Sequence, residues 1–295
     1  MRIGIDLGGT KIAIVVLDDA GVVRWERRVP TPRGDYDATL QAIAALVHDA
    51  EARVGACRVG VGMPGTLSRT TGLVKNANSI WLIGRPLQQD LDARLGRSVR
   101  LANDANCFAM SEAADGAAAG APVVFGIILG TGVGGGIVVR GEIVEGVNSI
   151  AGEWGHNPLP FPDDDERPGP ACYCGRHGCI ETFLSGPAVG ADYSGSAGTP
   201  GTTGTEVFER AAAGEPAAVA AVGRWQRRVA KSLASVINVL DPDVIVAGGG
   251  LSNVEAIYTA VPALWRPYVF SDAVATRFVR ARHGDASGVR GAAWL

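Results

Sequence analysis

The stretch that decides the fold is GIDLGGTK at residues 4–11. The apolar run at residues 2–7 is typical of a strand, and the paired Gly8 and Gly9 that follow it predict a tight turn. A second apolar run, residues 12–17, begins directly after the turn. The chain is therefore expected to open with two strands joined by a glycine turn.

The residues of this turn suit a phosphate group. Backbone N–H groups at Gly8 and Gly9 can approach a phosphate closely because neither residue has a side chain. Thr10 can donate a hydroxyl hydrogen, and Lys11 supplies positive charge. Asp6, at the strand end, offers the hard oxygen ligand that Mg²⁺ prefers. The spacing matches neither a Walker A loop nor G-x-G-x-x-G, and a plain hairpin turn is the alternative interpretation.

A similar pattern recurs at residues 126–136, GIILGTGVGGG, and a second apolar run follows it. Each copy is strand, glycine turn, strand, which predicts a duplicated chain with a domain change between about residues 100 and 125. We divide the chain into residues 1–120, completed by the C-terminal helix, and residues 121–295. Because strand–glycine–strand hairpins are common, a recurrence without duplication is the alternative.

The second copy and a third turn extend the nucleotide interpretation. Thr131 and Gly132 can bind phosphate, but Ile128 stands where the first copy has its acid, so only the first copy can direct charge to a metal. The third turn comprises Gly248, Gly249 and Gly250. These glycines permit close approach of a flat ligand such as adenine, and a plain strand-to-helix turn is the alternative. Three glycine turns at strand ends favour a nucleotide cleft between two domains.

The composition excludes several classes of protein. The 295 residues are 47% hydrophobic and 19% charged, which excludes a disordered or fibrous chain. The net charge of −3 gives no electrostatic reason to expect nucleic acid or an anionic membrane as a partner. No targeting segment or membrane helix is expected, and five cysteines, an odd number, fit a reducing compartment. We therefore predict a cytoplasmic protein.

Asp104 is a candidate general base. It is a short acid between the strand expected at residues 99–102 and the helix expected from Ala105 to about Ala119. Phosphoryl transfer needs alignment, charge neutralisation and a base for the attacking hydroxyl. An aspartate at this place could equally cap the helix, and from the residues alone both interpretations stay open.

A cluster of cysteines suggests a metal. Cys172, Cys174 and Cys179 fall within one short segment, and His156 lies sixteen residues before the first of them. Three thiolates and one imidazole form a standard closed set for structural zinc. His177, inside the segment, competes for the fourth position, and free thiols or one reversible disulfide are the alternatives.

The order of these motifs resembles that of the ROK family of sugar kinases. The segments that carry the resemblance are DLGGTK at 6–11, NDAN at 103–106, GTG at 130–132, EWGH at 153–156 and CYCGRHGCIE at 172–181. The resemblance spans essentially the whole chain. It implies an α/β fold of two actin-like (ribonuclease-H-like) domains with the active site in the cleft between them, ATP with Mg²⁺, and a homodimer.

The resemblance also implies roles for individual residues. Asp104 takes the proton of the sugar hydroxyl, and His156 rather than His177 completes a structural Zn²⁺ site. Further sugar contacts are implied for Gly65, Asn78, Asn103, Glu153, His156 and Glu181. A histidine that binds metal through one ring nitrogen can hydrogen-bond through the other. His156 could therefore connect the zinc segment to the sugar.

Within the family, KNANS at 75–79 and WGHNPLP at 154–160 look like the bacterial fructokinase and mannokinase group. The expected reaction is ATP-dependent phosphorylation of the 6-hydroxyl of fructose, with mannose as a second substrate. An N-acetylglucosamine, N-acetylmannosamine or glucose kinase of the same family is the near alternative.

Two alternatives belong to other classes of protein. A sugar-sensing ROK repressor needs a helix-turn-helix ahead of the nucleotide turn, and Asp6 leaves no room for one in this sequence. A sugar-binding protein with an inactive site is disfavoured because Asp6, Lys11 and Asp104 are all present.

Overall fold

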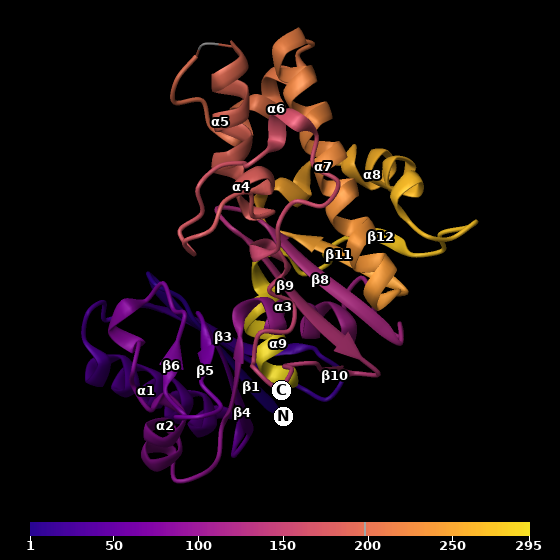
Figure 1. Ribbon diagram of the computed structural model, residues 1–295. Helices are drawn as coiled ribbons and strands as arrows, with labels where there is room; N and C mark the ends of the chain where they lie inside the picture. Colours follow the sequence, from indigo (N-terminus) through magenta and orange to yellow (C-terminus); the bar gives the residue numbers. More distant parts are fainter. Residues whose placement is uncertain (198) are drawn as a thin grey trace. The chain divides into compact units, whose positions relative to one another are not determined.

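The structure is a computed structural model that describes residues 1–197 and 199–295. The chain has a mixed α/β fold and divides into two compact units (Figure 1). Unit 1 comprises Met1–Gly120, Gly136–Gly152 and Arg282–Leu295; unit 2 comprises Ala121–Gly135 and Glu153–Ala281. The division follows Gly120, and unit 1 includes the C-terminal helix. Unit 1 also includes residues 136–152, which the sequence-based division places in the second domain.

Unit 1 is built on a five-stranded sheet of order β3-β2-β1-β4-β7. The bounds are β1 Arg2–Leu7, β2 Lys11–Leu17, β3 Val23–Pro30, β4 Arg58–Met63 and β7 Arg100–Asn103. The first three strands pair antiparallel, whereas β4 pairs parallel with both β1 and β7. The hairpin β5 (Thr66–Leu67) and β6 (Val74–Lys75) lies outside this sheet.

Helices cover both faces of this sheet, which explains why its central strands are apolar almost throughout. The helices of unit 1 are α1 Tyr36–Val54, α2 Leu87–Leu95, α3 Asp104–Ala114 and α9 Ser287–Trp294. Strand β2 alternates between two cores: Ile12 and Ile14 pack with residues of α1, whereas Ala13 and Val15 pack with residues of α9.

Helix α9 lies unusually close to the strands beneath it. A Cβ atom at Gly4 of β1 would overlap the carbonyl oxygen of Val289, and one at Gly60 of β4 would overlap that of Ala292. On the helix itself, a Cβ at Gly291 would overlap the carbonyl oxygen of Cys107 in α3. Glycines at these contacts let the C-terminal helix pack against the backbone of the sheet and of α3.

Unit 2 contains most of a second five-stranded sheet, of order β10-β9-β8-β11-β12. The bounds are β8 Val123–Leu129, β9 Val133–Val139, β10 Glu142–Ile143, β11 Val244–Gly248 and β12 Arg277–Arg280. As in the first sheet, a glycine turn joins two neighbouring strands, β8 and β9, and the next two strands pair parallel. The shared strand order agrees with the duplication that the sequence predicts.

The helices of unit 2 are α4 Glu181–Leu184, α5 Gly186–Ala197, α6 Gly204–Ala212, α7 Pro216–Leu240 and α8 Ile257–Trp265. Helices α5, α6 and α7 pack against one another (Figure 1). A buried ion pair, Arg228 Nε to Glu166 Oε1 at 2.6 Å, joins α7 to the segment that precedes the cysteines. In the described part of the chain, no helix combines the length and apolar character needed to cross a bilayer.

The structure corrects several boundaries expected from the sequence. Helix α3 ends at Ala114 rather than near Ala119. The sequence also predicts a mostly helical region at 206–238, and the structure forms it as two helices separated at residues 213–215. The region 194–204, expected as a loop, begins inside α5, which extends to Ala197; its residue Gly198 lies outside the described residues. Strand β12 was not anticipated.

Candidate active site

The predicted acids of unit 1 lie at one edge of its sheet. Strand β1 pairs with β4 so that Asp6 is opposite Gly62, and β4 pairs with β7 so that Met63 is opposite Asn103. The carboxyl ends of these three parallel strands therefore lie together, and Asp104 begins α3 directly after the third. In open α/β sheets, ligands bind at this edge.

Both acids titrate abnormally. Burial, and then the negative charge of Asp104, raises the pKa of Asp6 to about 6, against the smaller effects of Lys11 and Arg28. Burial also raises the pKa of Asp104, although hydrogen bonds from Ala105 and Asn103 oppose the rise. Two acids at one sheet edge that both have raised pKa values are typical of a site that handles protons or cations.

Asn103, not Asp104, caps α3. Its Oδ1 accepts a hydrogen bond from Ala105 N at 2.9 Å, and Asp104 is the first helical residue. Asn103 therefore holds the N-cap position, and Asp104 Oδ1 also accepts from Ala105 N, at 2.8 Å. Asn103 also donates from Nδ2 to the carbonyl of Gly65 at 3.1 Å. Because Gly65 has φ of +73° and meets the backbone of Lys75, this turn requires glycine.

The first glycine turn is closed by backbone hydrogen bonds. Gly8 N donates to Lys11 O at 3.0 Å, and the buried Thr31 donates from Oγ1 to Gly8 O at 2.7 Å. Thr10 and Lys11 are exposed. A Cβ at Gly9 would lie 3.6 Å from Ser79 Oγ, so the segment containing the exposed Asn78 runs beside the turn. Thr31 was missed because a lone threonine before a loop has no distinguishing pattern.

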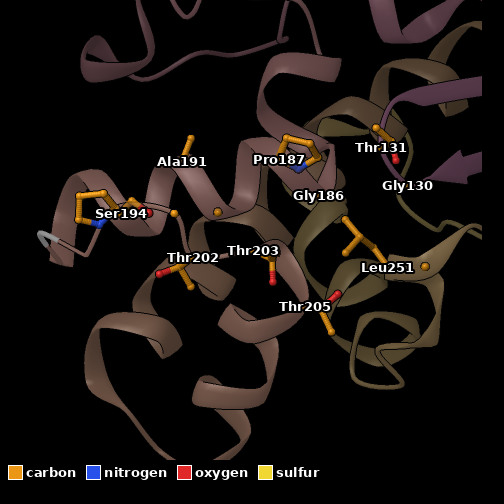
Figure 2. A pocket seen from close by; sticks show the side chains of 15 residues that line it. Gly130, Thr131, Gly186, Pro187, Ala191, Ser194, Thr202, Thr203, Thr205 and Leu251 are labelled. Carbon is orange, nitrogen blue, oxygen red and sulfur yellow. The ribbon is translucent and has the colours of Figure 1, made fainter.

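Unit 2 holds a cavity of about 850 Å³ (Figure 2). It is lined by residues 130–131, by Gly186, Pro187, Gly190, Ala191 and Ser194 of α5, by residues 200–205, and by Gly250 and Leu251. Thr131 and Gly250, both predicted to bind nucleotide, are therefore brought to one cavity. The sequence does not indicate α5 or the threonines at 202, 203 and 205 as part of a site, because glycine- and threonine-rich segments resemble ordinary loops.

Two other glycines predicted to bind nucleotide, Gly248 and Gly249, directly precede the cavity-lining Gly250. Gly249 has φ of +83°, and a Cβ there would overlap the carbonyl oxygen of Leu129. Gly248 ends β11. Gly186 N donates to Gly130 O at 2.7 Å, which fixes the start of α5 beside the second glycine turn. Backbone N–H groups at the N-terminus of a helix favour anionic ligands.

Glu181 is joined to the second glycine turn. Its Oε2 accepts a hydrogen bond from Val133 N at 2.8 Å, and a Cβ at Gly132 would approach the same oxygen at 2.7 Å. Trp154 donates from Nε1 to Gly134 O at 2.9 Å. The neighbouring Glu153 is exposed. Two predicted sugar-contact segments, 153–156 and the start of α4, are thus attached to the turn between β8 and β9.

His156, Cys172, Cys174 and Cys179 form a cluster whose ligand atoms all lie within 4.8 Å of one another. Cys174 Sγ and Cys179 Sγ are 3.6 Å apart, as are Cys172 Sγ and His156 Nδ1. Two sulfur ligands of a tetrahedral zinc ion lie about 3.7 Å apart, so the donor set fits zinc. Among the described residues His177 is outside this cluster, so the alternative ligand is not supported.

The second ring nitrogen of His156 is also engaged. Its Nε2 lies 2.9 Å from the hydroxyl of Tyr173, and the two rings meet edge to face at 5.1 Å. Partial desolvation of the hydroxyl at the otherwise exposed Tyr173, followed by the charge of Glu181, raises the pKa of Tyr173 to about 12. The hydroxyl is therefore protonated at neutral pH.

Comparison with known proteins supports this reading of the motifs. The model of the ROK family matches residues 2–295. The chain belongs to the ROK family. The resemblance identified from the sequence motifs is therefore confirmed over nearly the whole length of the chain.

Curated relatives of this ROK protein are sugar kinases. The N-acetyl-D-glucosamine kinases of Shigella flexneri and of Escherichia coli O1:K1 are each 44% identical to it over 301 residues, covering 100% of this chain and 99% of the relative. Neither carries the name of a fructokinase, so the subgroup expected from the sequence is not supported.

Solved structures agree with the fold. The ROK hexokinase of Thermus thermophilus superposes with a TM-score of 0.88 at 34% identity, covering 99% of this chain and 96% of that one. A ROK glucokinase of Streptomyces griseus, in complex with glucose and AMPPNP, gives 0.77 at 31% identity and covers 99% and 97% of the two chains. The expected two-domain actin-like fold is confirmed.

Proposed function

We propose that this ROK protein transfers the γ-phosphoryl group of ATP to the 6-hydroxyl of N-acetyl-D-glucosamine. The observation that carries the proposal is the 44% identity, over complete lengths, to proteins named as kinases of that sugar. This identity favours N-acetylglucosamine, the near alternative, over fructose, the sugar that the sequence motifs favour.

Unit 1 supports the chemical step. Asp104 accepts the proton of the attacking hydroxyl, and its raised pKa brings it closer to the pH at which a general base is most effective. Asn103, whose amide is fixed between Ala105 and Gly65, orients the sugar. Asp6 offers a carboxylate towards the metal, and Mg²⁺ bound with ATP supplies charge neutralisation.

Unit 2 supports nucleotide binding. Its cavity of about 850 Å³ has the size of a small-molecule site. Thr131, Thr203 and Thr205 carry hydroxyl groups at its edge, and Gly250 and Leu251 complete one side (Figure 2). We assign this cavity to the adenosine part of ATP, and the glycine turn at its rim to the phosphates.

The metal cluster supports a structural role. His156, Cys172, Cys174 and Cys179 would hold Zn²⁺, which stabilises closed tetrahedral sites. The ion would fix the segment that leads into Glu181. The homodimer and the cytoplasmic location stay predictions from the family resemblance and the composition.

A coupled assay of ADP release tests the function. With ATP and Mg²⁺, the protein is offered N-acetylglucosamine, N-acetylmannosamine, glucose, mannose and fructose in parallel, and ³¹P NMR locates the phosphate on the product. We expect the highest kcat/KM with N-acetylglucosamine and a 6-phosphate product. A preference for fructose would reinstate the first expectation, and an absence of turnover on every sugar would refute the kinase assignment.

A further inference from the structure

Unit 1 contains a small cavity beside Asn103, with a volume of about 70 Å³. Its lining includes the apolar Met63, Leu67 and Leu101, together with Thr66 and Asn106. A cavity of roughly 150 Å³ holds a benzene molecule, so this one has room for about three non-hydrogen atoms. A hexose ring does not fit such a space, whereas one acyl substituent of a sugar does.

Asn106 contributes a polar group to this mostly apolar lining. It lies three residues after Asn103, so the two side chains belong to the same face at the start of α3. The residue is 9% exposed, and its Oδ1 is buried with no hydrogen-bond partner among the described residues. A buried acceptor left unpaired costs free energy, and in a native structure it calls for an explanation. A donor group that enters the cavity with a ligand would supply the partner.

The cavity is also lined by Glu145 and Ser149, and one arginine holds both. Arg69 donates from Nη2 to Glu145 Oε2 at 2.7 Å and from Nε to Ser149 Oγ at 3.2 Å. These bonds attach residues 145–149 to the segment that joins β5 to β6. Because Glu145 already pairs with an arginine, the cavity suits a neutral ligand group better than a cation.

An acetamido substituent matches these features. Its N–H is a donor for the buried Asn106 Oδ1, and its methyl group suits the apolar lining of Met63, Leu67 and Leu101. A hydroxyl in the same place could reach the acceptor but would leave the apolar space unfilled.

We propose that this cavity receives the 2-acetamido group of the hexose, and that Asn106 recognises its N–H. The proposal rests on the proposed function, because it places part of the same sugar beside Asn103, the residue assigned to orient it. It goes further by assigning the choice of N-acetylglucosamine over glucose to one buried amide and one small cavity.

Two variants test the proposal in different ways. Asn106→Leu removes the acceptor at nearly constant volume, and Thr66→Ile adds carbon to the lining and reduces the space. Thr70→Ile is the matched control, because Thr70 is exposed in a turn of the same segment. For each protein we would measure kcat and KM with N-acetylglucosamine, glucose and N-butanoylglucosamine, the Kd of each sugar by calorimetry, and Tm.

We expect the wild type to bind N-acetylglucosamine roughly 10-fold or more tightly than the N-butanoyl sugar, whose two further methylene groups exceed the cavity. Asn106→Leu should lower the ratio of kcat/KM for N-acetylglucosamine to that for glucose roughly 5- to 10-fold, the effect of one lost hydrogen bond. Thr66→Ile should lower the same ratio about 10-fold or more, because overpacking excludes the acyl group. Thr70→Ile should match the wild type.

An unchanged ratio in either folded variant would overturn the proposal and leave the cavity to solvent. A loss of kcat/KM that is equal for both sugars would overturn it too, since the role of Asn106 would then be structural. If Asn106→Leu does not fold, Thr66→Ile and the comparison of acyl lengths decide the question. A wild type that phosphorylates no N-acetylglucosamine is a separate result, which refutes the proposed function itself.

Discussion

The surroundings of Asp6 disfavour the charged form of its carboxyl group. Its pKa in the folded protein is about 6, compared with an ordinary value of 3.8. Between these values the folded state binds more protons than the unfolded state, so the contribution of Asp6 to stability is full below pH 3.8 and is lost as pH rises through 6. A carboxylate retained at such a cost is expected to serve a ligand, here the metal that accompanies ATP.

Asp6→Asn should therefore stabilise the protein while inactivating it. Without added Mg²⁺ at pH 7, we expect the free energy of unfolding to rise by about 1–3 kcal/mol, since each unit of pKa shift corresponds to about 1.4 kcal/mol. The gain should vanish near pH 3, below both pKa values, where Asp6 is protonated in the folded and in the unfolded state. Urea denaturation at the two pH values measures it, with the exposed Asp272→Asn as the control for net charge. A less stable variant at pH 7 would contradict this account.

Asp104→Asn removes the proposed general base and leaves the N-cap residue, Asn103, in place. Because Asn103 caps α3, the variant should keep its fold and its sugar KM within a few-fold. The loss of a positioned general base costs about 10²–10⁴ in kcat. Steady-state kinetics together with Tm would measure both effects. Near-normal turnover by a folded Asp104→Asn protein would exclude it as the base.

At the scale of elements, the packing of α9 on α3 depends on the absence of a side chain. Gly291→Ala places a methyl group against the carbonyl oxygen of Cys107. We expect a destabilisation of about 1–3 kcal/mol or more, the usual cost of overpacking. Gly223→Ala in α7, where a Cβ would meet only Arg227 Nη1 at 3.8 Å, should instead be neutral or stabilising by about 0.5–1 kcal/mol. Chemical denaturation of both variants measures the contrast, and equal effects would refute the close-approach argument.

Elements with a strong local pattern could be predicted from the sequence. The apolar runs expected at residues 2–7 and 12–17 match β1 and β2 to within one residue. Strand β12 was not predicted, because its four residues, RFVR, alternate apolar side chains with arginine and form too short a pattern to indicate a strand. The start of α5 was also missed, since Gly186 and Pro187 are residues that normally interrupt helices.

At the scale of the whole molecule, the candidate site was predictable where its chemistry is unusual. Asp6 and Asp104 stood out as acids beside glycine or asparagine, and the cysteines stood out by spacing. The cavity of unit 2 that we assign to the nucleotide was only partly predictable, because α5 and residues 200–205 present small side chains and backbone, which carry no chemical signature in a sequence. The position of Asn103 as cap, rather than Asp104, depends on a one-residue difference in where the helix begins.

The cluster of His156, Cys172, Cys174 and Cys179 in unit 2 brings together segments that are distant in sequence. Cys179 precedes Glu181 by two residues, and Glu181 is bonded to Val133 at the second glycine turn. His156 belongs to the segment that Trp154 attaches to the same turn. Without a cation, burial raises the pKa of the Cys179 thiol to about 12, so a bound metal is needed to hold it as a thiolate at neutral pH.

Removal of zinc should therefore lower sugar affinity together with stability. Treatment with a zinc-selective chelator is expected to lower Tm and to weaken sugar binding on the order of 10-fold or more, because the free energy of metal binding contributes to local folding. Added Zn²⁺ should restore both. His156→Gln should reproduce the loss, whereas His177→Gln, which alters the histidine outside the cluster, should retain metal and affinity. Elemental analysis, calorimetry with the sugar and thermal unfolding provide the measurements. The account fails if the purified protein contains no zinc, or if the metal-free protein binds sugar as tightly as before.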